Sequence, residues 1–133
     1  MRLVVDTSAV VAILRAEDDA WRFAEALGTA TQRIMSAGSY LEAGIVIARR
    51  DGRQDALDEF IKRVEIEVAA VTEAEAKEGL RAYQQFGRGS GHAANLNFGD
   101  CFSYALAKTR NLPLLFKGDD FIHTDIKPAL KPA

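Results

Sequence analysis

The chain has few of the residues that build disulfide-rich, thiolate-metal or low-complexity proteins. Its 133 residues include one cysteine, three prolines, ten glycines and two histidines. The single Cys101 allows neither an intrachain disulfide nor a cysteine-rich zinc site. The low proline and glycine content excludes collagen-like and low-complexity architectures. We therefore expect a chain that folds around a hydrophobic core in a reducing cytoplasm.

Long apolar runs and a charge excess of one sign are also missing. Asp6, Thr7 and Ser8 interrupt the first apolar stretch, which a secretory signal peptide does not tolerate. No segment approaches the ~20 consecutive apolar residues of a membrane-spanning helix. With 17 Lys and Arg against 19 Asp and Glu, the net charge of −2 excludes histone-like binding through a global positive field. We expect no membrane association, and any nucleic-acid contact would depend on a local surface.

The composition and the hydrophobic pattern favour one α/β domain over residues 1–133. Hydrophobic residues make up 48% of the chain and charged residues 27%, which fits a single globular core. Short apolar runs predict strands at 3–5, 33–36, 66–71 and 114–116. Amphipathic spacing and capping residues predict helices at 9–15, 18–27, 39–50, 54–64, 73–86 and 100–110. Because parallel strands need crossover connections, this alternation predicts a parallel sheet with helices on both faces.

Acidic side chains occur where the predicted strands end. Asp6 follows the first strand, and Asp119 and Asp120 follow the fourth. Glu42 and Asp100 lie in the first turns of predicted helices that can begin at the same sheet edge, where open α/β sheets bind ligands. Clustered carboxylates raise one another's pKa and therefore require protonation or a cation. Oxygen ligands without a cysteine cluster favour Mg²⁺ or Mn²⁺ over zinc.

These residues also have ordinary structural interpretations when taken singly. The spacing fits helix capping boxes at Ser39-x-x-Glu42 and Asn97-x-x-Asp100, a helix N-cap at Asp6, and a turn at Asp119-Asp120. Hydroxyl groups nearby come from Thr7, Ser8 and Ser103, for which capping and helix packing are the ordinary roles. No single position therefore identifies the site.

Four segments of the chain resemble, in the same order, the motif blocks of PIN-domain ribonucleases, in particular VapC-type toxins. The segments are VVDTSA at 4–9, SYLE at 39–42, NFGDCFSYA at 97–105 and LLFKGDDF at 114–121. They span essentially the whole chain, and the first and third are specific when they occur together. The resemblance implies a three-layer α/β/α sandwich around a central parallel sheet. It also implies a Mg²⁺-dependent endoribonuclease that acts as the toxin of a toxin-antitoxin pair.

The resemblance implies a role for each acid. Asp6 and Asp100 would be the principal ligands of Mg²⁺, for which Mn²⁺ could substitute. Glu42 would hold or orient a metal-bound water, whose lowered pKa would allow attack on phosphorus. One further acid would complete the pocket: Asp119 follows the strand at the usual offset, whereas Asp120 matches a common family variant.

The resemblance also implies partners: an RNA substrate, a cognate VapB-like antitoxin and a second copy of the chain in a homodimer. Apolar residues such as Trp21, Leu27 and Phe60 could exceed what one small core buries, which would fit such an assembly. An inhibitory antitoxin segment carrying Arg or Lys would pair with the carboxylates and compete with the metal.

Other function classes fit the residues less well. A receiver-like signalling module needs an acidic pair after the first strand and an Asp after the middle strand, where this chain has a lone Asp6 and Thr72. Haloacid-dehalogenase phosphatases need a second Asp at the position of Ser8. A cysteine hydrolase would need Cys101 and His92 to act as a pair. A catalytically silent PIN-like binding module is a further alternative, although the presence of every acidic position argues against it.

Overall fold

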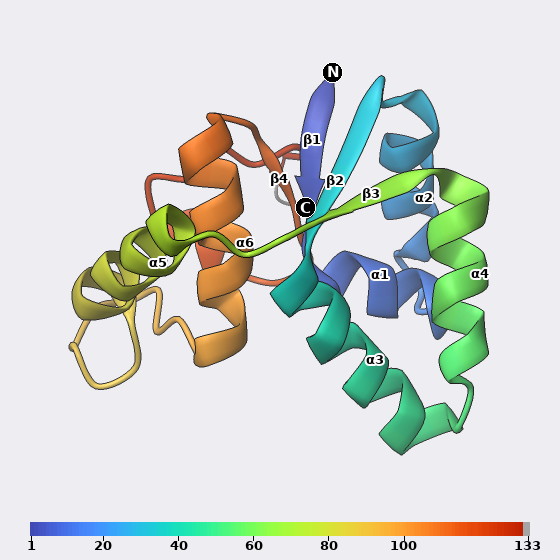
Figure 1. The fold of residues 1–133 in the computed structure, drawn as a ribbon, viewed down its shortest axis with the longest axis horizontal. Coiled ribbons are helices and arrows are strands. Elements are labelled where there is room, and N and C mark those ends of the chain that lie inside the picture. The colour runs from blue at the N-terminus through green and yellow to red at the C-terminus, as the bar shows by residue number, and fades with distance from the viewer. Residues whose placement is uncertain (132–133) are drawn as a thin grey trace.

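The computed structural model describes residues 1–131 and has the predicted alternation of strands and helices (Figure 1). The strands are β1 (Arg2–Val5), β2 (Gln32–Ser36), β3 (Ile66–Ala69) and β4 (Leu114–Leu115). The helices are α1 (Thr7–Leu14), α2 (Ala20–Thr29), α3 (Ala37–Asp51), α4 (Gln54–Val64), α5 (Glu73–Phe86), α6 (Phe98–Arg110) and the 3₁₀ turn η1 (Phe121–His123). Within the described residues, no helix combines the length and the hydrophobicity needed to cross a membrane.

The four strands form one parallel sheet in the order β3-β2-β1-β4. The register pairs Val4 of β1 with Ile34 of β2 on one side and with Leu114 of β4 on the other. The first and last strands of the chain are therefore neighbours in the sheet. Because all strands run in the same direction, the residues that follow β1 and β4 emerge at the same edge.

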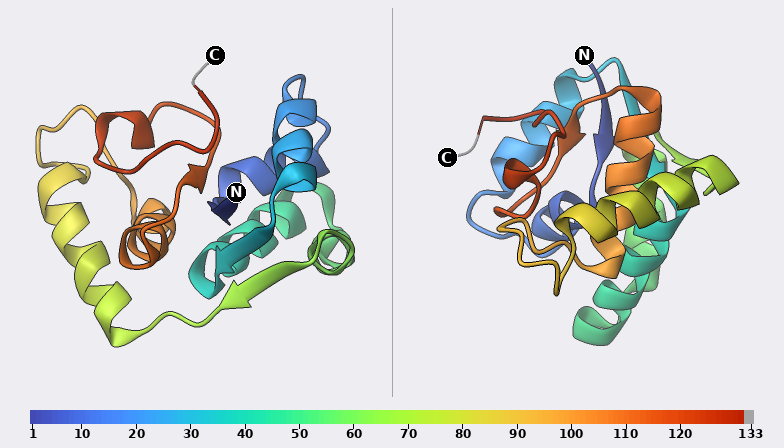
Figure 2. Two further views of the ribbon diagram at one scale, coloured as in Figure 1. Left: turned by 90° about the horizontal axis from the view of Figure 1, so that it is seen from above. Right: turned by 90° about the vertical axis from the view of Figure 1, so that its left-hand side faces the viewer.

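Helices cover both faces of the sheet, so the protein is a three-layer α/β/α sandwich. Side chains alternate along β1: Leu3 and Val5 face the core beneath α1 to α4, whereas Val4 faces the core beneath α5 and α6. Figure 2 shows α5 and α6 on one side of the sheet and the other four helices on the opposite side. The fold class predicted from the sequence is confirmed.

Helix α3 begins earlier than its sequence pattern predicts. Ser36 is the N-cap, and its hydroxyl accepts a hydrogen bond from the Gly38 N–H at 3.2 Å. The prediction that Ser39 caps this helix through a box with Glu42 is therefore wrong, because both residues lie inside the helix. Glu42 occupies the second helical turn, and Ser39 is fully buried.

The predicted surplus of apolar residues is only partly present. Leu27 and Phe60 belong to the core beneath α1 to α4 and are 2% and 8% exposed. Their stripe on α2 and α4 faces inward, as amphipathic helices of a globular protein normally do. Trp21, by contrast, is 66% exposed, and so is available to a partner.

Candidate active site

Asp6 lies where β1 ends and α1 begins, and β1 itself lies between β2 and β4 in the sheet. Its backbone N–H donates to the Leu115 carbonyl oxygen of β4 at 2.9 Å, which fixes the residue against the sheet edge. Its side chain caps α1, because Oδ2 accepts hydrogen bonds from the Ser8 N–H at 3.0 Å and from the Ser8 hydroxyl at 2.6 Å. The side chain of Asp6 is almost fully buried and is therefore held in one orientation.

Asp100 lies in the first turn of α6 and completes the predicted capping box. The Asn97 N–H donates to Asp100 Oδ2 at 3.0 Å, and the Asp100 N–H donates to Asn97 Oδ1 at 2.9 Å. Burial, together with repulsion from Asp6, Asp120 and Glu42, raises the pKa of the Asp100 carboxyl to about 7. The hydrogen bond from the Asn97 N–H opposes this rise. These three acids are therefore close enough to Asp100 to affect its charge.

Glu42 projects from α3 toward the start of α6. Its pKa is raised by burial and by repulsion from Asp6, while the Thr7 hydroxyl opposes both effects. The carboxylate lies directly against the Cα of Gly99: a Cβ at position 99 would be 1.9 Å from Glu42 Oε2. Only glycine leaves room for this close approach, so Gly99 allows the Glu42 carboxylate to approach Asp100, the next residue of α6.

The two adjacent acids after β4 differ in their relation to the cluster. Asp120 is among the groups that raise the pKa of Asp100, and Asp119 is not. Both side chains are exposed in the loop between β4 and η1. The electrostatics thus link Asp120, rather than Asp119, to Asp6, Glu42 and Asp100.

Two hydroxyls that the sequence analysis assigned to capping or packing contact the cluster. The Ser103 hydroxyl donates to Asp6 Oδ1 at 2.5 Å, and the Ser39 and Ser103 hydroxyl oxygens are 2.9 Å apart. The sequence spacing could have predicted that these serines lie beside the acids, because Ser39 precedes Glu42 by three residues and Ser103 follows Asp100 by three. Residues three apart share a helix face, so each serine lies beside an acid.

The donor set fits a hard divalent cation. Within residues 1–131, no three His, Cys, Asp or Glu side chains are placed so that they could together hold a metal ion. Mg²⁺ needs fewer protein ligands, because it keeps several waters and is held through one or two carboxylates. Burial, and to a lesser extent repulsion from neighbouring acids, raises the pKa of Asp100, and a cation beside it would stabilise the charged carboxylate. Carboxylate oxygens without thiolates favour Mg²⁺ or Mn²⁺ rather than zinc.

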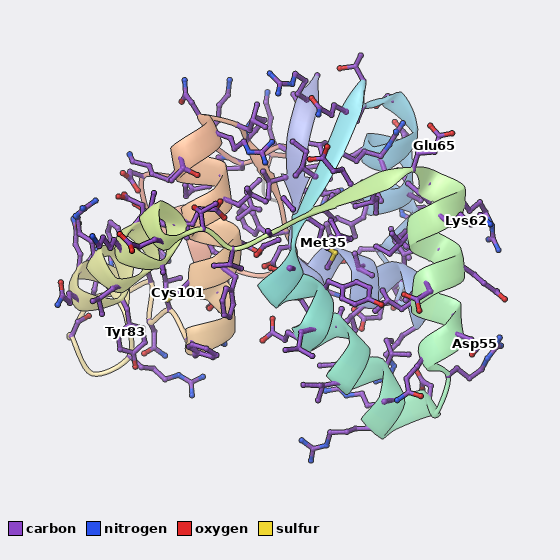
Figure 3. The ribbon with its side chains drawn as sticks, in the orientation of Figure 1. Met35, Asp55, Lys62, Glu65, Tyr83 and Cys101 are labelled. Atoms are coloured by element: carbon purple, nitrogen blue, oxygen red, sulfur yellow. The ribbon has the colours of Figure 1, made fainter. Side chains whose placement is uncertain are left out.

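Cys101 and His92 do not form a nucleophile and base. Burial, with a smaller effect of Asp100, raises the pKa of the Cys101 thiol to about 11, which keeps it protonated at neutral pH. Figure 3 shows Cys101 of α6 near α5, the helix that carries Tyr83, and both residues line the groove between the two helices. The His92 ring instead packs edge-on against Phe86, and its Nδ1 accepts a hydrogen bond from the Ala94 N–H. The arrangement does not support a cysteine hydrolase.

Known proteins share both the sequence and the fold of this chain. Residues 3–127 match the PIN domain family. Ribonuclease VapC28 of Mycobacterium tuberculosis is 55% identical over 133 residues, which cover 96% of this chain and 98% of that protein. Ribonuclease VapC42 of the same species is 46% identical, again over 96% and 98% of the two chains. The crystal structure of M. tuberculosis VapC20, a sarcin-ricin loop cleaving toxin, superposes with a TM-score of 0.74 at 18% identity and covers 98% of this chain and 99% of its own.

Proposed function

The chain belongs to the PIN-domain family and to its VapC ribonucleases, and from this premise we propose that its acidic cluster is the active site of a Mg²⁺-dependent endoribonuclease. The protein is the toxin of a VapBC-type pair. The observation that carries the proposed site is the convergence of Asp6, Glu42, Asp100 and Asp120 at the carboxyl edge of the sheet. A catalytically silent binding module would not need four acids held in repulsive proximity.

We assign a different role at the site to each of the four acids. Asp6 and Asp100 would hold Mg²⁺, or Mn²⁺ in its place, because both carboxylates are buried and fixed by hydrogen bonds. Glu42 would hold or orient the attacking water, since its half-buried carboxylate has a raised pKa and can accept a proton. Asp120 would complete the pocket from the exposed loop. When bound, the cation would supply charge neutralisation at the phosphate and a more acidic water.

We further propose that the working assembly is a cytoplasmic homodimer bound by a VapB-like antitoxin. Family membership supports the antitoxin, and the apolar surface supports protein partners. An apolar groove between α5 and α6 includes Leu80, Phe98 and Cys101, and the Leu80 and Phe98 side chains are 59% and 75% exposed. Exposed apolar area of this kind commonly marks an interaction surface.

Cleavage of RNA with and without chelator tests the proposed function. We expect the purified protein to cleave RNA in Mg²⁺ or Mn²⁺ and to lose that activity in excess EDTA. Asp100→Asn should lower the rate by roughly 100-fold or more while the circular dichroism spectrum stays unchanged, because it removes one charge of the cation site. Full activity in EDTA, or full activity of folded Asp100→Asn, would remove the metal or Asp100 from the mechanism.

A further inference from the structure

We propose that Ser39 and Ser103 are positioning residues: their hydroxyls form a buried relay that orients the Asp6 carboxylate and ties the helices bearing Glu42 and Asp100 to it. The inference rests on the proposed function, because it assigns a role toward the same site. Ser39 and Ser103 are both 0% exposed, and Asp6 is 4% exposed. Solvent therefore does not compete for these hydrogen bonds.

The direction of the relay follows from the number of protons available. An ionised carboxylate can only accept, so Ser103 must donate its single hydroxyl proton to Asp6 Oδ1. Ser103 has no second proton, so in the 2.9 Å contact between the two hydroxyls Ser39 is the donor. The hydrogen bonds thus run from Ser39 through Ser103 to Asp6. Donation from Ser39 polarises the Ser103 hydroxyl and strengthens its bond to the carboxylate.

The relay joins three elements that are distant in the sequence. Asp6 follows β1 as the N-cap of α1, Ser39 belongs to α3 and Ser103 belongs to α6. A third hydrogen bond reinforces the link between α1 and α3, because the Thr7 hydroxyl donates to the Ser39 carbonyl oxygen at 2.9 Å.

The relay also divides the two oxygens of Asp6 between separate donors. Oδ1 accepts from Ser103, and Oδ2 accepts from the N–H and the hydroxyl of Ser8. Ser8 in turn accepts the Lys117 N–H at 2.9 Å, so the loop after β4 supports the second oxygen. Both oxygens are therefore fixed: Oδ2 accepts two hydrogen bonds, whereas Oδ1 accepts one and keeps a lone pair for a cation. Partners of this kind around a metal-binding carboxylate typically change metal affinity by 10- to 100-fold when they are removed.

The test compares metal dependence in four folded variants. For Ser103→Ala, we expect the Mg²⁺ concentration for half-maximal RNA cleavage to rise by roughly 10-fold, with most of the rate recovered at saturating Mg²⁺. Ser39→Ala should raise this Mg²⁺ concentration less. The double variant, Ser39→Ala with Ser103→Ala, should match Ser103→Ala alone because Ser39 acts only through Ser103. Ser103→Thr keeps the hydroxyl and should stay close to the wild type. The increase in Tm caused by Mn²⁺, which requires no cleavage, should shrink in the same order.

Ser36→Ala is the matched control, because Ser36 is also a buried serine and caps the same helix α3. It should lower the Tm without changing the half-maximal Mg²⁺ concentration. If Ser103→Ala does not fold, Ser39→Ala carries the same comparison. An unchanged metal response in folded Ser103→Ala would overturn the proposal, and additive effects of the two substitutions would overturn the relay. A wild-type protein that cleaves no RNA, but whose Mn²⁺ response still depends on Ser103, would instead contradict only the proposed function.

Discussion

The electrostatics of the candidate site depend on individual residues, and the largest effect is on the pKa of Asp100. Its carboxyl is buried beside three other acids, so its pKa is raised to about 7. The candidate acids were identified from their positions after strands and in helix turns. The sequence left Asp119 and Asp120 as alternatives, because spacing does not fix how an irregular loop places its side chains. In the structure, Asp120 is among the groups that raise the pKa of Asp100, and Asp119 is not.

The adjacent acids after β4 provide a matched pair. We expect Asp120→Asn to lower the cleavage rate by about 10-fold, the equivalent of roughly 1.4 kcal/mol in the barrier. We expect Asp119→Asn to change it by less than about 2-fold, because Asp119 does not influence Asp100. Rates at saturating Mg²⁺ would measure both. A larger loss for Asp119→Asn would assign the fourth acidic position to Asp119.

The raised pKa of Asp100 also predicts how stability changes with pH. Between pH ~4, where an unfolded Asp titrates, and pH ~7, where the folded Asp100 titrates, the native state binds more protons than the unfolded state. The free energy of unfolding attributable to this group therefore falls as pH rises through that range. Metal-free wild type should lose more Tm between pH 4 and 7 than metal-free Asp100→Asn. Equal slopes in thermal melts of the two proteins would contradict this expectation.

Secondary-structure elements position the acids, and most of them were predictable from periodicity and capping. The start of α3 was not, because Ser36 and Ser39 are both acceptable caps by spacing. The contact that places Ser39 in the interior comes from Ser103, 64 residues along the chain. Helical spacing predicts only which residues of one helix share a face, so it cannot predict a partner on another helix. The approach of α3 to α6 is likewise a tertiary property, and it is close at Gly99, which lies against Glu42, and at Gly38, which lies against Phe102.

Substitution of Gly99 should separate catalysis from stability. In Gly99→Ala the new Cβ would displace the end of the flexible Glu42 side chain, and alanine favours the helix by up to about 1 kcal/mol. We expect the Tm to change little and the cleavage rate to fall by roughly 10-fold or more, which corresponds to about 1.4 kcal/mol. Gly28→Ala is the control, since a Cβ at that helical position meets nothing within 4 Å. That variant should keep full activity, and normal activity of Gly99→Ala would show that Glu42 is dispensable.

At the scale of the whole molecule, charge is balanced but unevenly placed. The net charge is only −2, yet four carboxylates share one edge of the sheet. A partner that blocks this edge would therefore present a cation, whatever else it contacts. The overall composition could not reveal this local field, because the basic residues elsewhere cancel it in the sum.

Inhibition by a VapB-like antitoxin should depend on that local field. We expect a cationic antitoxin segment to bind several-fold more weakly at 0.5 M than at 0.05 M salt, since screening shortens the reach of exposed charges to a few ångströms. Binding should also weaken in Asp100→Asn, measured by titration calorimetry because that variant is expected to cleave RNA too slowly for an inhibition assay. Indifference of the affinity to both changes would place the antitoxin on a surface away from the acids.

The sheet order has a consequence for how the protein is made. β1 is synthesised first, but one of its two neighbours, β4, is synthesised nearly last. Asp6 depends on that late neighbour, because its N–H bonds to Leu115 and its capping serine accepts the N–H of Lys117. Contacts so distant along the chain form late in folding. We therefore expect a nascent chain that has not yet reached β4 to be inactive, and a chain terminated before β4 to have no toxicity.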